Sequence, residues 1–381
     1  MGKWVGKYVI GLTGNIATGK SVVRKMLEHL GAYGIDADAL AHRVIAKGAP
    51  GYKPVVETFG RYILRADGEI DRAKLGKLVF SDPDGLAYLE KIVHPIVDKA
   101  IDLIIKRARQ PVVVIEAIKL FEAGISKDCD SIWVAYAPSE IQLFRLVTKR
   151  KMSEADAQQR ISAQAPQEEK VRAAQVVIKN MNTFEDTWRQ VVTAWRKSVP
   201  KITVSQQESV AVSKEISAEG AVVERGRPGH SGEIARIINR IRKDGNELGS
   251  DDIMEAFGEK AFLLLRAGKD IIGLIGWQVE NLIACTVDIV IDPGVQISKA
   301  LTALISEMEI ASLELQCEAS LVFVSQEFET YRDVWKSLGY EQREIEALKV
   351  PAWQEAACES QTPETKLYFK QLRKDRILRP L

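Results

Sequence analysis

The segment from Gly14 to Ser21, with the sequence GNIATGKS, has the residue types and spacing of a phosphate-binding loop. It fits the pattern G-x-x-x-x-G-K-[ST], in which a glycine-rich loop presents backbone N–H groups to phosphate oxygens. We expect Lys20 to reach the β- and γ-phosphates of a nucleotide and the Ser21 hydroxyl to ligate Mg²⁺. The chemistry that this segment predicts is the binding and transfer of a nucleotide phosphate.

The sequence around the loop predicts the elements that must hold it. An apolar run at 8–12 precedes it and a helical pattern from Val22 follows it, which is the strand–loop–helix context of a P-loop. The N-terminus of that helix adds a partial positive charge. A chance match in a glycine-containing turn is the alternative. The predicted ATP contacts in this segment are Gly14, Asn15, Ile16, Ala17, Thr18, Gly19, Lys20, Ser21 and Val22.

Two acids, Asp36 and Asp38, follow the next predicted strand. In an open α/β sheet, acids at the carboxyl end of a strand lie beside the ligand crevice. One of the two could instead cap the helix that begins near Ala39. We favour a chemical role for Asp38, and the capping alternative stays open.

Glu116 ends a continuous β-branched run at 111–116, which predicts a strand buried on both faces of a parallel sheet. A carboxylate at that strand end could hold the water shell of Mg²⁺, as a Walker-B acid does. Further strands are expected at 131–136 and 176–180.

A helical region is predicted from 39 to 109, and a basic helical stretch follows the strand at 131–136. His94, next to a proline, is either a helix-breaking structural position or a substrate contact. Arg145 and Arg150, followed by Arg160, could close over a triphosphate as a mobile flap and stabilise charge during transfer. A solvated charged face is the alternative for these arginines.

A set of segments occurs in order between residue 8 and about residue 197: GLTGNIATGKS, DADALAH, FGRYILRADGEIDRAKLGKLVF, LEKIVHPIV, FEAG, QLFRLVTKR, RISAQ and VVIKN. By these segments, this part of the chain resembles the dephospho-coenzyme A kinase family, which catalyses the last step of coenzyme A synthesis. The resemblance implies a P-loop kinase fold, a parallel sheet with a helical substrate-binding insert. It also implies ATP-dependent phosphorylation of the ribose 3′-hydroxyl of dephospho-CoA.

The same resemblance implies a role for each candidate residue. Asp38 would orient or deprotonate the acceptor hydroxyl, and Lys20 and Ser21 would manage phosphate and Mg²⁺. The three arginines belong to the lid. Asn15 stands where the family usually has glycine, which we expect to be tolerated because Asn accepts a left-handed backbone. Lys119 departs from the family and could alter acceptor contacts. The remaining assignments are Arg160 and Asn180 to ATP, His94 and Glu116 to the substrate, and Ser21 and Glu116 to the metal.

A polar segment at 198–220 predicts a linker to a second domain. After it, the patterns run strand, helix, hairpin, strand, helix, strand, helix, an order that resembles the acetyltransferase fold of the GNAT superfamily. We therefore expect two domains, an α/β kinase domain at 1–197 and a GNAT-like α+β domain at 221–381 that ends in an amphipathic helix.

The motif by which GNAT enzymes hold the CoA pyrophosphate, [QR]-x-x-G-x-[GA], is damaged here. Pro293, Gln296 and Ser298 occupy its places, where side chains would crowd the phosphates and proline removes a donor. Trp335 stands where many members have a tyrosine acid, and indole cannot protonate a thiolate. We expect no transferase activity. A regulatory protein that binds nucleotide or CoA, and a bifunctional kinase with an active N-acetyltransferase domain, are the alternatives.

The composition of the 381 residues, 46% hydrophobic and 28% charged with a formal net charge of +1, is typical of a soluble globular protein. It gives no indication of nucleic-acid or membrane binding. No C-x-x-C pair occurs, which favours reduced thiols over a disulfide framework or a zinc site. No apolar run is long enough to cross a bilayer and no signal peptide is evident, so we expect a cytoplasmic protein. The oligomeric state is left open. The four cysteines are Cys129, Cys285, Cys317 and Cys358.

Overall fold

A computed structural model of the chain describes residues 3–80, 82–200, 221–242, 247–362 and 364–374. Its residue contacts divide it into two compact units. The first comprises residues 1–35, 109–278 and 288–310, and the second comprises 36–108, 279–287 and 311–381. Each unit therefore contains residues from both predicted domains, whose boundaries remain a prediction. Residues 201–220 of the predicted linker lie outside the described residues.

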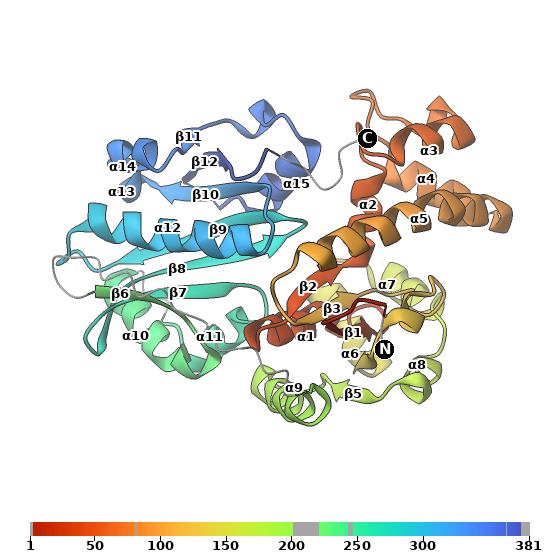
Figure 1. The fold of residues 1–381 in the computed structure, drawn as a ribbon, viewed down its shortest axis with the longest axis horizontal. Helices are drawn as coiled ribbons and strands as arrows, with labels where there is room; N and C mark the ends of the chain where they lie inside the picture. Colours follow the sequence, from red (N-terminus) through yellow and green to blue (C-terminus); the bar gives the residue numbers. More distant parts are fainter. Residues whose placement is uncertain (1–2, 81, 201–220, 243–246, 363, 375–381) are drawn as a thin grey trace. The chain divides into compact units, whose positions relative to one another are not determined.

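A five-stranded sheet of order β2-β3-β1-β4-β5 carries the phosphate loop (Figure 1). The pairs β1–β3, β1–β4 and β4–β5 are parallel. Leu12 is opposite Glu116, so the carboxyl ends of β1 and β3 lie side by side. Every residue of β3 is buried, as its β-branched run predicts. The strands are β1 (Tyr8–Thr13), β2 (Tyr33–Asp36), β3 (Val112–Glu116), β4 (Ser131–Tyr136) and β5 (Val176–Lys179).

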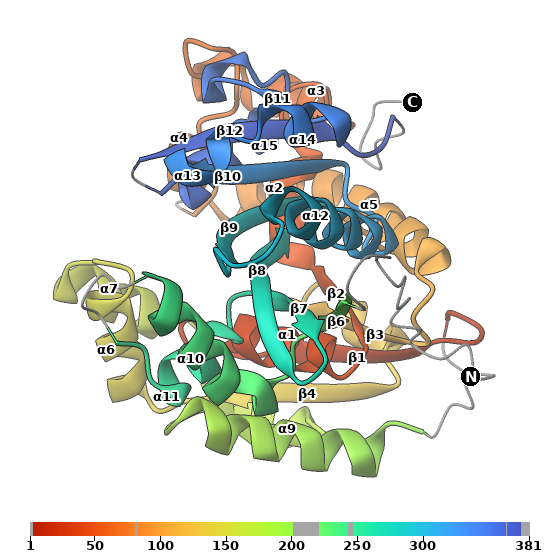
Figure 2. The same ribbon diagram turned by 90° about the vertical axis from the view of Figure 1, so that its left-hand side faces the viewer.

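Helices α1 (Lys20–His29) and α9 (Phe184–Ser198) bury their apolar faces against one face of this sheet (Figure 2). Val23 and Leu27 of α1 and Val191 of α9 pack there with alternate residues of the strands. This is the pattern expected for a helix whose apolar residues recur every three or four positions. The basic stretch forms α6 (Ser139–Thr148), α7 (Glu154–Ser162) and α8 (Gln167–Ala173).

The predicted helical region at 39–109 is confirmed. Helix α5 continues through Pro95 to Arg107, so a helix-breaking role for His94 is wrong. His94 lies half-buried inside this helix. The helices of this region are α2 (Ala37–Val44), α3 (Tyr52–Phe59), α4 (Arg72–Phe80) and α5 (Pro83–Arg107).

The second sheet has seven strands in the order β11-β12-β10-β9-β8-β7-β6. Its β6–β7 and β7–β8 pairs are antiparallel, whereas β9 and β10 are parallel. A parallel pair needs a crossover connection, which α12 (Ile297–Glu314) supplies. The predicted α/β fold class and the GNAT-like element order are confirmed. The strands are β6 (Ala221–Arg225), β7 (Ala261–Ala267), β8 (Asp270–Glu280), β9 (Ile283–Ile291), β10 (Ala319–Ser325), β11 (Glu341–Gln342) and β12 (Thr365–Gln371).

The predicted C-terminal amphipathic helix is wrong over its first part, because residues 365–371 form β12. This strand pairs antiparallel with the buried strand β10, with Leu367 opposite Phe323 and Phe369 opposite Leu321. Tertiary pairing with a buried strand outweighs the local helical pattern here. Residues 375–381 lie outside the described part of the chain.

The structure describes the state of the cysteines and allows a search for membrane-spanning helices. All four cysteines are free. Burial raises the pKa of both Cys129 and Cys285 to about 12, which keeps these thiols protonated and unreactive. Among the residues that the structure describes, no helix combines the length and apolar character needed to cross a membrane.

Candidate active site

The phosphate loop leaves β1 at Gly14 and enters α1 at Lys20, as its motif predicts. Gly19 has a φ of +89°, and a Cβ built on it would lie 1.9 Å from Nδ2 of Asn180. A Cβ on Gly14, where φ is +152°, would lie 2.4 Å from the carbonyl oxygen of Ala135. Both positions therefore require glycine for backbone conformation and for close approach. The loop curls tightly enough to present its amides to a phosphate.

Asn15 is tolerated for a different reason from the expected one. The left-handed non-glycine residue of the loop is Ala17, with a φ of +57°, and Asn15 does not adopt positive φ. Instead, the buried side chain of Asn15 donates to the carbonyl oxygen of Ala165 at 3.0 Å and accepts from Lys170 Nζ at 3.0 Å. Asparagine fits here because both ends of its amide are hydrogen-bonded in a buried place.

Ser21 and Glu116 meet at the edge where β1 and β3 end. The Ser21 hydroxyl donates to Glu116 Oε1 at 2.8 Å, and Arg24 Nε donates to Glu116 Oε2 at 2.7 Å. Glu116 is buried, so the arginine on the next turn of α1 compensates its charge. A hydroxyl and a carboxylate oxygen this close are hard oxygen ligands that fit Mg²⁺, which takes its other ligands from phosphate and water. Arg24 is a site residue that the motif did not predict.

Arg145 and Asn180 brace the loop from α6 and from the end of β5. Arg145 donates to the carbonyl oxygens of Ala17 at 3.1 Å and Asn180 at 3.0 Å. Asn180 Nδ2 donates to the carbonyl oxygen of Thr18 at 3.0 Å. Partial burial lowers the pKa of Arg145 from its ordinary value. The structure thus brings these two predicted residues into direct contact with the phosphate loop.

The connection between α7 and α8 also contacts the loop. Gln164 Oε1 accepts from the backbone N–H of Ile16 at 2.7 Å, and Lys170 Nζ donates to the carbonyl oxygen of Ile118 at 3.2 Å. One amide that the motif assigns to phosphate is therefore used by a glutamine side chain. A phosphate that takes this amide must displace Gln164.

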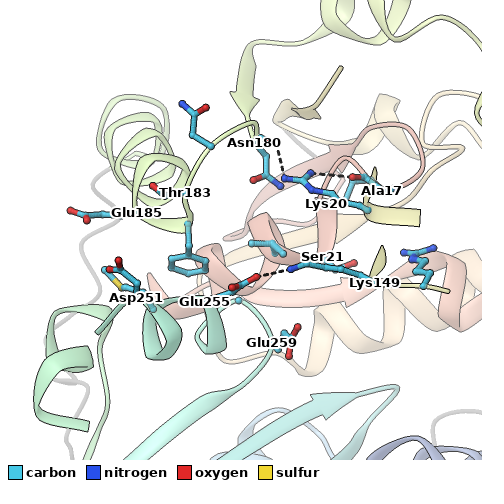
Figure 3. Close-up of a pocket in the computed structure, with 18 residues that line it drawn as sticks. Ala17, Lys20, Ser21, Lys149, Asn180, Thr183, Glu185, Asp251, Glu255 and Glu259 are labelled. Atoms are coloured by element: carbon cyan, nitrogen blue, oxygen red, sulfur yellow. Dashed lines mark hydrogen bonds and ion pairs between the residues drawn. The ribbon is translucent and has the colours of Figure 1, made fainter. Parts of the chain in front are cut away.

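A pocket of about 510 Å³ opens beside the loop, within the first unit (Figure 3). Eight predicted residues line it, while Gly14, Asn15, Ile16, Thr18, Arg160 and Glu116 do not. Arg160 is exposed on α7, and its ATP contact remains a prediction. The predicted residues in the lining are Ala17, Gly19, Lys20, Ser21, Val22, Arg145, Arg150 and Asn180. The unpredicted ones are Lys149, Asn182, Thr183, Phe184, Glu185, Asp251, Met254, Glu255, Gly258 and Glu259.

A hydrogen bond within the second unit shows which of the two acids, Asp36 or Asp38, caps helix α2. Asp36 is the N-cap of α2, where its side chain accepts from the backbone N–H of Ala39 at 2.8 Å. Asp38 lies in the first turn of α2 and is half-buried. Asp36 is therefore the residue that caps the helix. The chemical roles predicted for Asp38 and His94 remain predictions.

In the loop that the sequence predicts as the counterpart of the GNAT pyrophosphate site, a backbone N–H group is already hydrogen-bonded to a side chain of the same loop. The backbone N–H of Gly294 donates to Asp292 Oδ1 at 2.9 Å, and Arg240 pairs with Asp292 Oδ2 at 2.8 Å. Trp335 is fully buried in α14 (Arg332–Ser337), and its indole N–H donates to the carbonyl oxygen of Phe328 at 2.9 Å. Trp335 is therefore a core residue.

The comparison with known proteins separates the two halves of the chain. Residues 8–186 match the dephospho-CoA kinase family (CoaE). The dephospho-CoA kinase of Geobacter metallireducens is 43% identical over 196 residues, which are 51% of this chain and 98% of that protein. That of Carboxydothermus hydrogenoformans is 45% identical over 192 residues, or 50% of this chain and 93% of that protein.

A solved acetyltransferase of the GNAT family from Staphylococcus aureus is also similar to this chain. It is 14% identical and has a TM-score of 0.33, with 40% of this chain and 99% of that chain covered. The kinase relatives, in contrast, are matched over nearly their whole length at more than 40% identity. By that match, and with a P-loop whose serine meets a strand-end glutamate, the chain belongs to the dephospho-CoA kinase family.

Proposed function

We propose that this protein transfers the γ-phosphoryl group of ATP to the ribose 3′-hydroxyl of dephospho-CoA. The observation that carries the proposal is the hydrogen bond of 2.8 Å between the Ser21 hydroxyl and the buried carboxylate of Glu116, beside Lys20 on a glycine-bounded loop. Phosphoryl transfer is catalysed mainly by positioning and by compensation of charge, and this loop has the groups for both. The choice of dephospho-CoA as the acceptor of the phosphoryl group comes from the family to which the chain belongs.

Each residue has a role that follows from its place. Lys20 compensates charge between the phosphates, and Arg145 stabilises charge from the α6 side. Ser21 and Glu116 would hold Mg²⁺, which would supply positive charge to neutralise the phosphates. Asp38 would accept the proton of the attacking hydroxyl, because a carboxylate just after a strand of an open α/β sheet lies beside the ligand crevice. Arg150 would contribute from the rim of the pocket, and we expect the reaction in the cytoplasm.

The test is to incubate the full chain with ATP and Mg²⁺, with and without dephospho-CoA, and to measure the ADP that is released. The acceptor is then analysed by mass spectrometry. We expect ADP release that depends on the acceptor and a product with the mass of CoA. Lys20→Ala provides the control and should lower the rate by about 10²-fold or more. ADP release that does not depend on dephospho-CoA would contradict the proposal.

We also propose that the GNAT-like half has no acetyltransferase activity. Gly294 already donates its amide to Asp292, and the carboxylate of Asp292 would repel a pyrophosphate at that place. The buried indole of Trp335 cannot act as the acid. Acetyl-CoA with a panel of amines should give no acetylated product. Formation of an acetylated amine by the full chain would overturn this proposal.

A further inference from the structure

Part of the wall of the pocket beside the phosphate loop comes from the second half of the chain. Helix α11 (Ser250–Ala256) and the turn after it contribute Met254, Glu255 and Gly258 to this wall. Glu255 faces the side of the pocket on which Lys20 and Ser21 lie (Figure 3). These residues lie in the same compact unit as the loop but outside the stretch that matches the kinase family.

The wall is held in place by apolar packing and by a hydrogen bond. Phe184, at the start of α9, packs against the core of the five-stranded sheet and also against the core beneath α11. A Cβ on Gly258 would lie 3.1 Å from the ring of Phe184, so the turn after α11 lies directly against it. At the other end of α1, His29 Nε2 lies 2.8 Å from the carbonyl oxygen of Phe257. Met254 and Glu255 are thereby fixed with respect to the loop.

The chemistry of the pocket suits a nucleoside attached to a polyphosphate. Its loop side, Gly19 to Ser21, is the phosphate end, because the amides of such a loop cradle the phosphates. Its lining also includes the half-buried apolar side chains of Phe184 and Met254, and aromatic and thioether groups are favourable partners for a flat base. A volume of about 510 Å³ lies in the range of small-molecule sites.

Glu255 adds a polar contact to this apolar wall. Its Oε1 lies 2.6 Å from Lys149 Nζ, with the two side chains 65% and 61% exposed. An ion pair this exposed contributes little to stability. The carboxylate is therefore accessible at the rim, where it can accept hydrogen bonds from a ribose hydroxyl or from an exocyclic amine.

From this arrangement we infer that the GNAT-like half completes the ATP site of the kinase: Met254 contacts the base of the nucleotide and Glu255 accepts a hydrogen bond from its nucleoside. The inference rests on the proposed function in one respect, that the phosphate loop holds ATP. It gives the second half of the chain a direct part in the first half's reaction.

The test is calorimetric titration of the full-length chain with two probes, ADP and inorganic tripolyphosphate. The variants are Met254→Ala and Glu255→Gln, and Asp270→Asn is the control, an exposed carboxylate at the first residue of β8 in the same half. We expect the Kd for ADP to rise about tenfold in Met254→Ala, equivalent to about 1.4 kcal/mol, and about fivefold in Glu255→Gln. The Kd for tripolyphosphate should stay unchanged in both, and Asp270→Asn should match the wild type.

Several results would overturn the inference. An unchanged Kd for ADP in both variants would exclude contact with the nucleoside. An equal loss of affinity for ADP and for tripolyphosphate would mean that the substitutions disturb the loop instead. Weaker binding of dephospho-CoA with unchanged binding of ADP would assign the pocket to the acceptor. A failure of the proposed function is distinguishable, because the chain would then bind ADP through these residues yet not phosphorylate dephospho-CoA.

Discussion

The hydroxyl of Ser21 donates to Oε1 of Glu116 at 2.8 Å, and the two residues come from segments 95 positions apart in the chain. The parallel pairing of β1 with β3 places Leu12 opposite Glu116, which brings the phosphate loop and the acid to one edge of the sheet. Arg24 holds the second oxygen of the same carboxylate. The orientation of Glu116 is therefore set before any ligand binds.

Glu116→Gln tests the metal role of this carboxylate. The amide keeps the size of the side chain but loses the charge that favours Mg²⁺. We expect turnover to fall by about 10²-fold, and the Mg²⁺ concentration that gives half-maximal rate to rise. Initial rates measured across a Mg²⁺ titration give both quantities. Arg24→Gln serves as the comparison, since it removes the other partner of Glu116 and leaves the carboxylate. An unchanged Mg²⁺ requirement in Glu116→Gln would contradict the metal role.

The neighbouring acids Asp36 and Asp38 should respond in opposite ways. Asp38→Asn is expected to lower phosphoryl transfer by about 10²-fold or more while ADP binding and stability stay unchanged, because it removes a basic oxygen. Asp36→Ala removes the cap on Ala39 and should lower the free energy of unfolding by about 1 kcal/mol. Steady-state kinetics, ADP titration and urea denaturation of the two variants measure these effects. Loss of ADP affinity in Asp38→Asn would place Asp38 in the nucleotide–metal site instead.

A buried ion pair secures the helix that carries Asp38. Within the second unit, Arg43 of α2 lies 3.1 Å from Glu318 Oε2, and the two side chains are 6% and 1% exposed. Removal of one partner from a buried pair is costly because the other charge stays desolvated. We expect Arg43→Met to lower the free energy of unfolding by about 3 kcal/mol. Urea denaturation measures the loss.

The matched control for this pair is Arg72→Met, which removes an exposed ion pair with Glu355 in the same unit. Its side chains are 47% and 49% exposed, and we expect a loss below about 1 kcal/mol. The double variant Arg43→Met, Glu318→Gln should recover part of the loss, since no desolvated charge then remains. Equal effects of Arg43→Met and Arg72→Met would show that burial does not govern the Arg43 contact.

The last residue of α1 makes stability depend on pH. Burial, together with the positive charge of Arg225, lowers the pKa of His29 to about 4. Its Nε2 contacts the carbonyl oxygen of Phe257, while its Nδ1 is buried and has no hydrogen-bond partner among the residues that the structure describes. The ring is therefore neutral in the folded chain, with the proton on Nε2, although Glu28 nearby favours the charged form.

The sign of the effect follows from proton binding. Below pH 6.5 the unfolded chain binds a proton at this histidine and the folded chain does not, so stability falls as the pH is lowered from 6.5 towards 4. The loss from this residue reaches up to about 3 kcal/mol. Urea denaturation of the wild type and of His29→Gln, each at pH 7.5 and at pH 5, isolates the contribution of His29. All other groups titrate in both proteins, so their effects cancel when the two proteins are compared. A difference between the two proteins that does not change with pH would contradict the assignment.

Local sequence patterns predicted the elements that hold the phosphates. Glycine spacing, strand-end acids and the β-branched run at 111–116 are local signals, and the structure has the loop, Glu116 and every strand of the first sheet where these signals place them. The capping of α2 by Asp36 was one of two alternatives, since either acid is a good cap chemically. Backbone hydrogen bonds, which sequence does not show, decide between them.

The features that sequence reasoning missed depend on distant contacts. Met254 and Glu255 line the pocket from more than 230 positions beyond Ser21, and no local pattern marks α11 as part of a nucleotide site. In the sequence, Lys170 looks like any other lysine of a charged helix. Only the structure shows that it is buried and donates to the side chain of Asn15. The pairing of β12 with β10 likewise turned a segment with a helical pattern into a strand. Long-range pairing of this kind outweighs local propensity.

The most direct test of the account is the position of the phosphate that the full chain adds to dephospho-CoA. Wild-type protein is incubated with ATP, Mg²⁺ and dephospho-CoA, and the product is analysed by phosphorus NMR and mass spectrometry, with Lys20→Ala in parallel. We predict a single product phosphorylated on the ribose 3′-hydroxyl, formed together with ADP, and almost none with Lys20→Ala. A folded wild-type chain that binds ADP but leaves dephospho-CoA unphosphorylated would contradict the account and favour a regulatory nucleotide-binding protein.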